Sequence, residues 1–124
     1  MPLLALLAAC TTDPVWESIA HGEESEEGFS AAWTCYHDSA GIEQAPLLEM
    51  EAWTSVELIA VEVEFSVGEF EPLWQLDAAT WSGRTWDVEC NDQLLVIFYA
   101  YAYHEEYTMS LLHRLPVGAA HEDP

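Results

Sequence analysis

Apolar and polar residues alternate with a period of two in several segments of the chain. In VEVEFSV, residues 61–67, every second side chain is apolar and the intervening ones are glutamate or serine. In FSAAWTCYH, residues 29–37, one face carries Phe29, Ala31, Trp33 and Cys35. This period is typical of β-strands that have one buried face and one face in water. Both segments are therefore predicted to be strands.

Two later segments also predict strands. Residues 84–90, RTWDVEC, are followed by a turn signal at Asn91-Asp92. Their alternation places three side chains on one face, those of Trp86, Val88 and Cys90. Residues 93–103, QLLVIFYAYAY, are apolar on both faces, which predicts a central strand.

The remaining segments complete the expected fold. Residues 107–115, YTMSLLHRL, are predicted to form a strand that ends at Pro116. Residues 43–52, EQAPLLEMEA, fit either a helical turn or a short strand. Short strands separated by turns predict an all-β domain, either a small antiparallel β-sandwich or a partly open barrel.

The aromatic residues are the main candidates for a binding surface. Tyr99, Tyr101 and Tyr103 form a stripe on one face of a predicted strand. Residues 77–83, DAATWSG, are typical of a loop, so Trp81 is the best candidate for an exposed aromatic side chain. Such residues could bind sugars or peptides. The alternative is that the stripe belongs to the core or to a half-covered sheet face.

The first ten residues have a different character. Residues 3–10, LLALLAAC, show no alternation and are too short for a transmembrane helix, which needs about 20 apolar residues. They end in Leu7-Ala8-Ala9-Cys10, which resembles the lipobox of bacterial lipoproteins: a branched apolar residue, two small residues and a cysteine. The resemblance implies cleavage before Cys10, a lipid on its thiol and a place in the bacterial cell envelope, facing the periplasm or the cell exterior. The alternatives are a first core strand or a chance match.

The lipoprotein interpretation divides the chain. A signal peptide begins with a positively charged region, and Met1-Pro2 carries no such charge, so we expect the basic residues upstream of residue 1. A hydrated acidic segment after the anchor would hold the domain off the bilayer. The expected parts are a signal segment at 1–9, a lipidated cysteine and flexible acidic linker at 10–28, the β domain at 29–116 and a flexible tail at 117–124.

The remaining two cysteines are expected to pair. If Cys10 carries a lipid, Cys35 and Cys90 remain, and an exported protein lies in an oxidising compartment. Closing a loop of this length contributes roughly 4 kcal/mol in the chain-entropy description. The alternative is two separate buried thiols.

Charge restricts the partners. The chain has 23 Asp and Glu residues in total but only two Arg residues and no Lys, and its net charge is −21. Phosphate binding needs Lys and Arg, which argues against nucleic acid and anionic lipid headgroups as direct partners. The charge fits a cationic partner, divalent ions or simple solubility. Contact with a membrane would then depend on the lipid at Cys10.

No motif indicates catalysis, a cofactor or a metal. His104-Glu105-Glu106-Tyr107 begins like the zinc motif HExxH but has tyrosine in place of the second histidine, and we expect a hairpin turn there. The expected role is a membrane-tethered binding or interaction module. The alternatives are a small envelope enzyme with a composite site of histidines and carboxylates, and a purely structural envelope component.

Overall fold

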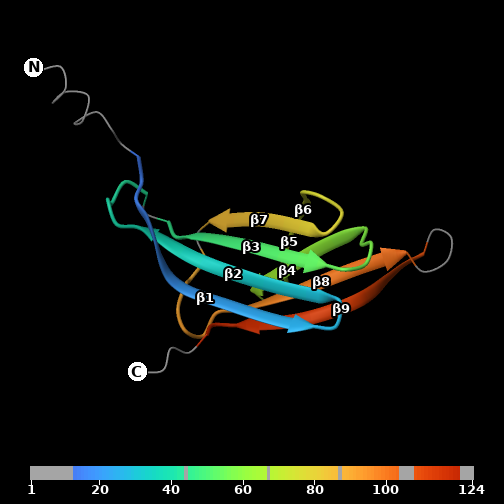
Figure 1. Cartoon of the computed structure of the whole chain (residues 1–124). Coiled ribbons are helices and arrows are strands. Elements are labelled where there is room, and N and C mark those ends of the chain that lie inside the picture. The colour runs from blue at the N-terminus through green and yellow to red at the C-terminus, as the bar shows by residue number, and fades with distance from the viewer. Residues whose placement is uncertain (1–12, 44, 67, 87, 104–107, 121–124) are drawn as a thin grey trace, which may run out of the picture.

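The computed structural model describes residues 13–43, 45–66, 68–86, 88–103 and 108–120 (Figure 1). Cys10, the expected signal segment and the expected turn at residues 104–107 lie outside these ranges. Within the described residues the chain forms nine strands: β1 (Trp16–Glu26), β2 (Phe29–Asp38), β3 (Leu47–Thr54), β4 (Ala60–Ser66), β5 (Glu69–Pro72), β6 (Trp74–Gln75), β7 (Thr80–Trp86), β8 (Leu95–Tyr103) and β9 (Met109–Gly118).

The strands form two antiparallel sheets that face each other (Figure 1). The first sheet has the order β1-β2-β3-β7-β6, and the second has the order β5-β4-β8-β9. The predicted all-β antiparallel sandwich is thus confirmed. In segment 43–52, which the sequence left open, residues 47–52 belong to β3 and are extended rather than helical.

The core lies between the sheets and follows the predicted alternation. In β2 every second side chain is buried from Phe29 to Cys35, and Trp33 is only 1% exposed. In β4, Val61 and Val63 point inward while Glu62 lies on the outer face, as expected. The central strand β8 contributes three buried side chains, Val96, Phe98 and Ala100.

Strand β1 corrects the expected flexible linker. Residues 16–26 pair with β2 along their whole length, so only the part of segment 10–28 that precedes Trp16 is left as a candidate tether. Glutamates are compatible with this strand because it lies at the edge of its sheet, where side chains reach water. Ala20 and Gly22 supply the small inward-facing residues.

The two sheets meet at the edge where β1 approaches β9. The indole Nε1 of Trp33 donates a buried hydrogen bond to the carbonyl of Val117, at 2.9 Å. The backbone N–H of Ala120 donates to the carbonyl of His21, at 2.7 Å. A Cβ atom added at Gly22 would lie 2.2 Å from the carbonyl oxygen of Gly118, so only glycine permits this approach.

Strand β9 continues past Pro116, contrary to the expected end. Val117 is fully buried and Gly118 is still in the strand, so the predicted flexible tail cannot begin at residue 117. Proline is tolerated here because β9 is the edge strand of its sheet.

Strand β7 replaces most of the loop expected at residues 77–83. It begins at Thr80, and Trp81 is a core residue that is 4% exposed, so its expected exposure is wrong. The glycine that suggested a loop serves packing instead. A Cβ atom at Gly83 would lie 2.6 Å from Cδ2 of Leu73. Because Gly83 has no side chain, Leu73 can pack directly against its backbone.

The end of β7 also differs from the predicted pattern. Trp86 is 46% exposed on the outer face, whereas Val88 is buried. The strand ends at Trp86, so the alternation does not carry on to Val88 and Cys90. The turn expected at Asn91-Asp92 is present, since the side-chain oxygen of Asn91 accepts a hydrogen bond from the Gln93 N–H at 2.8 Å.

The predicted disulfide is present between Cys35 and Cys90, with their Cα atoms 6.2 Å apart. It joins the buried face of β2 to the segment that leads into β8. The two cysteines therefore form a disulfide and are not two separate buried thiols.

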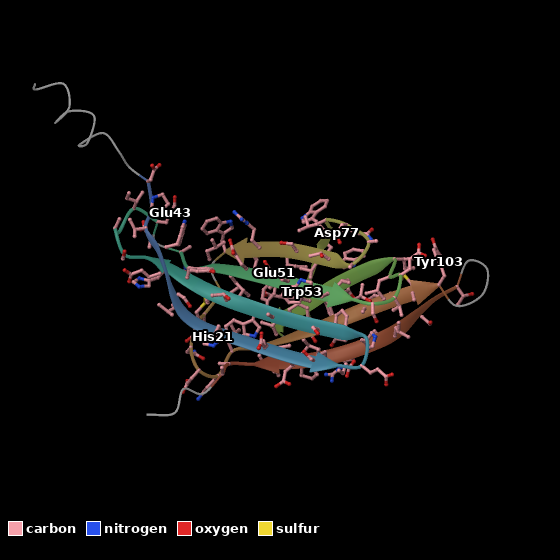
Figure 2. The ribbon with its side chains drawn as sticks, in the orientation of Figure 1. His21, Glu43, Glu51, Trp53, Asp77 and Tyr103 are labelled. Carbon is pink, nitrogen blue, oxygen red and sulfur yellow. A yellow bond between two sulfur atoms is a disulfide. The ribbon has the colours of Figure 1, made fainter. Side chains whose placement is uncertain are left out.

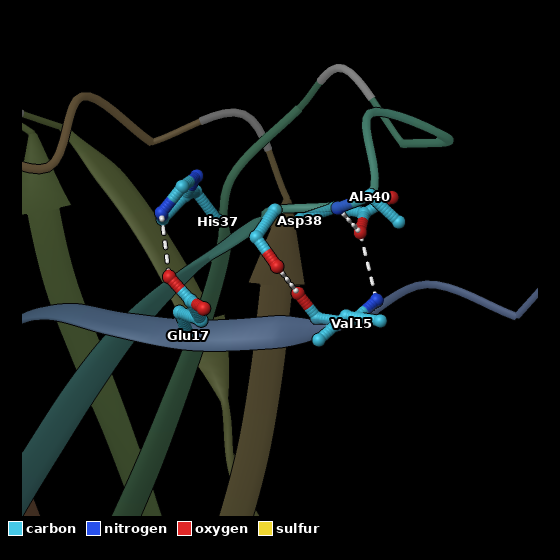
Figure 3. A network of polar contacts seen from close by, with 6 residues as sticks. Val15, Glu17, His37, Asp38 and Ala40 are labelled. Carbon is cyan, nitrogen blue, oxygen red and sulfur yellow. Dashed lines mark hydrogen bonds and ion pairs between the residues drawn. The ribbon is translucent and has the colours of Figure 1, made fainter.

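A carboxylate organises the turn after β2 (Figure 3). Oδ1 of Asp38 accepts the N–H groups of Val15 and Ala40, and Oδ2 accepts those of Ile42 and Glu43, at 2.7–2.9 Å. Burial raises the pKa of Asp38, but the four backbone donors outweigh this effect and hold the pKa below its ordinary value. The carboxylate of Asp38 thus stabilises the turn as a hydrogen-bond acceptor.

Replacing Gly22 with alanine is expected to strain the edge between the sheets. The Gly22→Ala variant should lose about 1–3 kcal/mol of unfolding free energy, since the added methyl group meets the backbone carbonyl of Gly118 and the indole of Trp33, which is buried. Gly118→Ala is the matched control, because a Cβ there lies 4.0 Å from its nearest neighbour, Cδ1 of Leu95. Urea unfolding measures both. Equal losses would contradict this explanation of Gly22.

Two buried tryptophans are expected to respond differently to phenylalanine. Trp33→Phe leaves the carbonyl of Val117 without the indole donor, whereas Trp81→Phe removes an N–H that has no hydrogen-bond partner among the described residues. Trp33→Phe should therefore cost about 1–3 kcal/mol more than Trp81→Phe. Denaturant unfolding of the two variants tests this, and the reverse order would refute it.

Candidate binding face and cleft

The tyrosine stripe lies on the outer face of the second sheet. Tyr99 and Tyr101 are half-buried, and Tyr103, labelled in Figure 2, is 69% exposed at the end of β8. The tyrosine stripe therefore lies on a half-covered sheet face and not in the core. The opposite side of β8 supplies the core.

Two tyrosines of the stripe are held by carboxylates of β4. The hydroxyl of Tyr99 donates to Oε1 of Glu64, and that of Tyr101 donates to Oε1 of Glu62, both at 2.8 Å. Each bond runs diagonally, because Glu62 lies directly opposite Tyr99 in the strand pairing. The rings are therefore fixed along the surface of the sheet.

The hydrogen bonds also set the charge state of this face. The backbone N–H of Gly68 and the hydroxyl of Tyr99 hold the pKa of Glu64 below its ordinary value, with a smaller contribution from Arg114. Burial, together with the neighbouring Glu62, raises the pKa of Tyr101 to about 12. At neutral pH Glu64 is thus ionised and Tyr101 is protonated.

Further aromatic and basic groups surround Tyr99. The ring of Phe70, from β5, lies 5.7 Å from the Tyr99 ring, and the guanidinium carbon of Arg114, from β9, lies 5.8 Å from it. We call this the tyrosine face; it comprises Glu62, Glu64, Phe70, Tyr99, Tyr101, Tyr103 and Arg114.

A large cleft adjoins the tyrosine face and shares Glu64 and Phe70 with it. Its volume is about 1080 Å³, and it lies between the β4–β5 hairpin, the end of β7 and the segment that leads into β8. Four carboxylates line it, those of Glu64, Glu69, Glu71 and Glu89. Phe70, Trp86 and Leu95 add apolar surface, and each is 46–48% exposed. We call this the acidic cleft.

The sequence indicated the tyrosine face but not the acidic cleft. Tyr99, Tyr101 and Tyr103 share one strand, so their period of two was sufficient to place them together. Trp81, expected to join them, is buried in the other sheet. The cleft residues come from segments around positions 64–71 and 85–97, and only the pairing of strands brings these together.

A smaller cleft of about 360 Å³ is the nearest approach to a composite site of histidine and carboxylates. His37, Asp38 and Glu43 line it, with Cys90 at one side. Asp38 is occupied by backbone donors, as described above. Nε2 of His37 lies 3.7 Å from Oε2 of Glu17, and both side chains are largely exposed (Figure 3). Asp38 therefore stabilises the turn, while Glu17 and His37 form a cross-strand pair between β1 and β2.

Other observations bear on binding partners. Within the described part of the chain, no group of three or more His, Cys, Asp or Glu residues could hold a metal ion. No helix among those residues is long and apolar enough to cross a membrane. Comparisons with protein-family models, curated proteins and solved structures give no significant match.

Tyr101 is expected to make stability depend on pH in alkaline solution. Its pKa is about 12 in the folded chain against an ordinary value of 10.0, so its stabilising contribution is complete below pH 10 and is lost between these values. Tyr101→Phe should therefore show a smaller fall in unfolding free energy over this range than the unchanged protein. Tyr103→Phe, which alters an exposed ring, is the control and should leave the fall unchanged. An unchanged pH profile in Tyr101→Phe would refute the prediction.

Proposed function

We propose that this protein is a lipid-anchored binding module of the bacterial cell envelope, tethered through Cys10 and facing the periplasm or the cell exterior. The disulfide between Cys35 and Cys90 is the observation that carries the proposal. Disulfides persist in oxidising compartments, which fits an exported protein. The pairing also leaves Cys10 as the third cysteine, in the segment that resembles a lipobox.

The outer face of the second sheet supports a binding role. It carries the stripe of tyrosines together with several other apolar side chains that are about half exposed or more, namely Phe70, Leu95, Met109 and Leu111. Soluble monomers rarely expose contiguous apolar patches of this kind unless they use them for interaction. Ordered carboxylates and the guanidinium of Arg114 give the patch polar groups that can orient a ligand.

An enzyme remains the weaker alternative. The two clefts contain carboxylates whose pKa values are lowered, as for Asp38 and Glu64, so these groups stay ionised and accept hydrogen bonds. A general acid at neutral pH needs a raised carboxylate pKa. The geometry therefore favours binding over acid–base catalysis.

Membrane fractionation tests the anchor. The gene, expressed in a bacterial host with its upstream in-frame codons, should place the protein in the membrane fraction and incorporate labelled fatty acid. Cys10→Ala should move it to the soluble fraction and abolish labelling, because the thiol that carries the lipid is gone. Thr12→Ala is the matched control and should behave like the unchanged protein. If the unchanged protein and Cys10→Ala fractionate alike, the anchor at Cys10 is refuted.

A further inference from the structure

The acidic cleft has an unusual charge balance. Within the part of the chain that the structure describes, its lining includes four glutamates and no Arg, Lys or His. The ion pairs of the described residues involve Glu17, Glu26 and Glu49, none of which lines this cleft. Arg114 acts on Glu64 from the adjoining tyrosine face, but it does not line the cleft. An excess of carboxylates in a concave site concentrates the electrostatic field and attracts a cation.

The walls of the cleft indicate what kind of cation it accepts. The Trp86 indole and the Phe70 ring are each nearly half exposed beside the carboxylates. A guanidinium group can stack on an aromatic face and bond a carboxylate at the same time, which a simple metal ion cannot do. Gln93, also in the lining, adds a side-chain amide that can bond a peptide backbone.

The position of the cleft favours an extended chain. Its volume of about 1080 Å³ is at the upper end of the range for small-molecule pockets, about 300–1,000 Å³. Strand β5 forms one border and is the edge strand of its sheet, with all four residues exposed. An edge strand offers backbone groups to which an extended peptide can pair.

A second copy of the chain does not satisfy this site. Each copy has a net charge of −21 and only two basic residues, Arg84 and Arg114. Arg84 already lies 3.3 Å from Oε1 of Glu49, and Arg114 lies over the ring of Tyr99. Bringing two copies together at the cleft would add repulsion rather than neutralise its carboxylates.

We propose that the acidic cleft binds an extended, arginine-containing segment of a partner protein, whose guanidinium groups contact the exposed indole of Trp86 and the carboxylates of Glu69 and Glu71. This proposal deepens the binding role given above and rests on it. It does not depend on the lipid at Cys10. Peptide binding in solution therefore tests the cleft, and membrane fractionation tests the anchor, so one can be refuted without the other.

Calorimetric titration of the full chain carrying Cys10→Ala tests the proposal. The probe is a capped octapeptide of alternating arginine and serine, and its citrulline counterpart has the same shape without charge. The arginine peptide should bind at low salt and the citrulline peptide should not. The double variant Glu69→Gln/Glu71→Gln should weaken binding about tenfold, because two charge contacts are lost.

Matched variants separate the cleft from the overall charge. Glu23→Gln/Glu24→Gln makes the same charge change on β1, far from the cleft in the sheet order, and should weaken binding less than about twofold. Trp86→Ala should weaken binding about fivefold, whereas Trp74→Ala, which removes an exposed indole outside the cleft, should not. Thermal unfolding confirms that each variant is folded.

Several results would overturn the proposal. Equal weakening in the two double variants would mean that the peptide senses only net charge. Equal binding of the citrulline peptide, or no binding of the arginine peptide, would also refute it. Tighter binding of a neutral cello-oligosaccharide that Trp86→Ala abolishes would identify the cleft as a sugar site instead.

Discussion

The structure depends on the contact between β1 and β9, where the two sheets of the sandwich meet. The indole of Trp33 crosses from the first sheet to the carbonyl of Val117 in the second, and its N–H is satisfied although the ring is fully buried. Gly22 permits the backbones to approach because it has no side chain. A buried polar group without a partner would destabilise the core, so this bond also fixes which edges of the sheets can meet.

The same arrangement places the candidate surfaces. The sheets are joined at β1 and β9 on one side, and on the other the chain passes directly from β5 to β6 through the buried Leu73. The acidic cleft is lined by the end of β7, the start of β8 and the segment that connects these two strands. One of its walls, which includes Glu89 and Asn91, flanks Cys90 and is tied to the core of β2 by the disulfide. The disulfide therefore stabilises the cleft as well as the fold.

Alternation of apolar and polar residues was enough to predict those strands that bury every second side chain. Strands β2 and β4 and the tyrosine side of β8 follow a period of two, because each packs one face against the core. Strand β1 was missed because its stability comes from pairing with β2 and from the close approach of Gly22 to Gly118 of β9, and its glutamates suggested a solvated segment. Trp81 was misplaced because the role of Gly83 depends on Leu73, which lies ten residues earlier.

Two sets of carboxylates in this acidic chain differ in their bonding. Asp38, Glu64 and Asp77 accept backbone N–H groups, and these bonds lower their pKa values despite the opposing effect of burial, which is the largest single effect at Asp38. Their contribution to stability is present at neutral pH and is lost as the pH falls through their folded pKa values. Glu69 and Glu71 lie exposed on an edge strand, and no ion pair of the described residues includes them. Their charges are left to act on molecules outside the fold, and the repulsion between them is a reason for a cationic ligand to bind there.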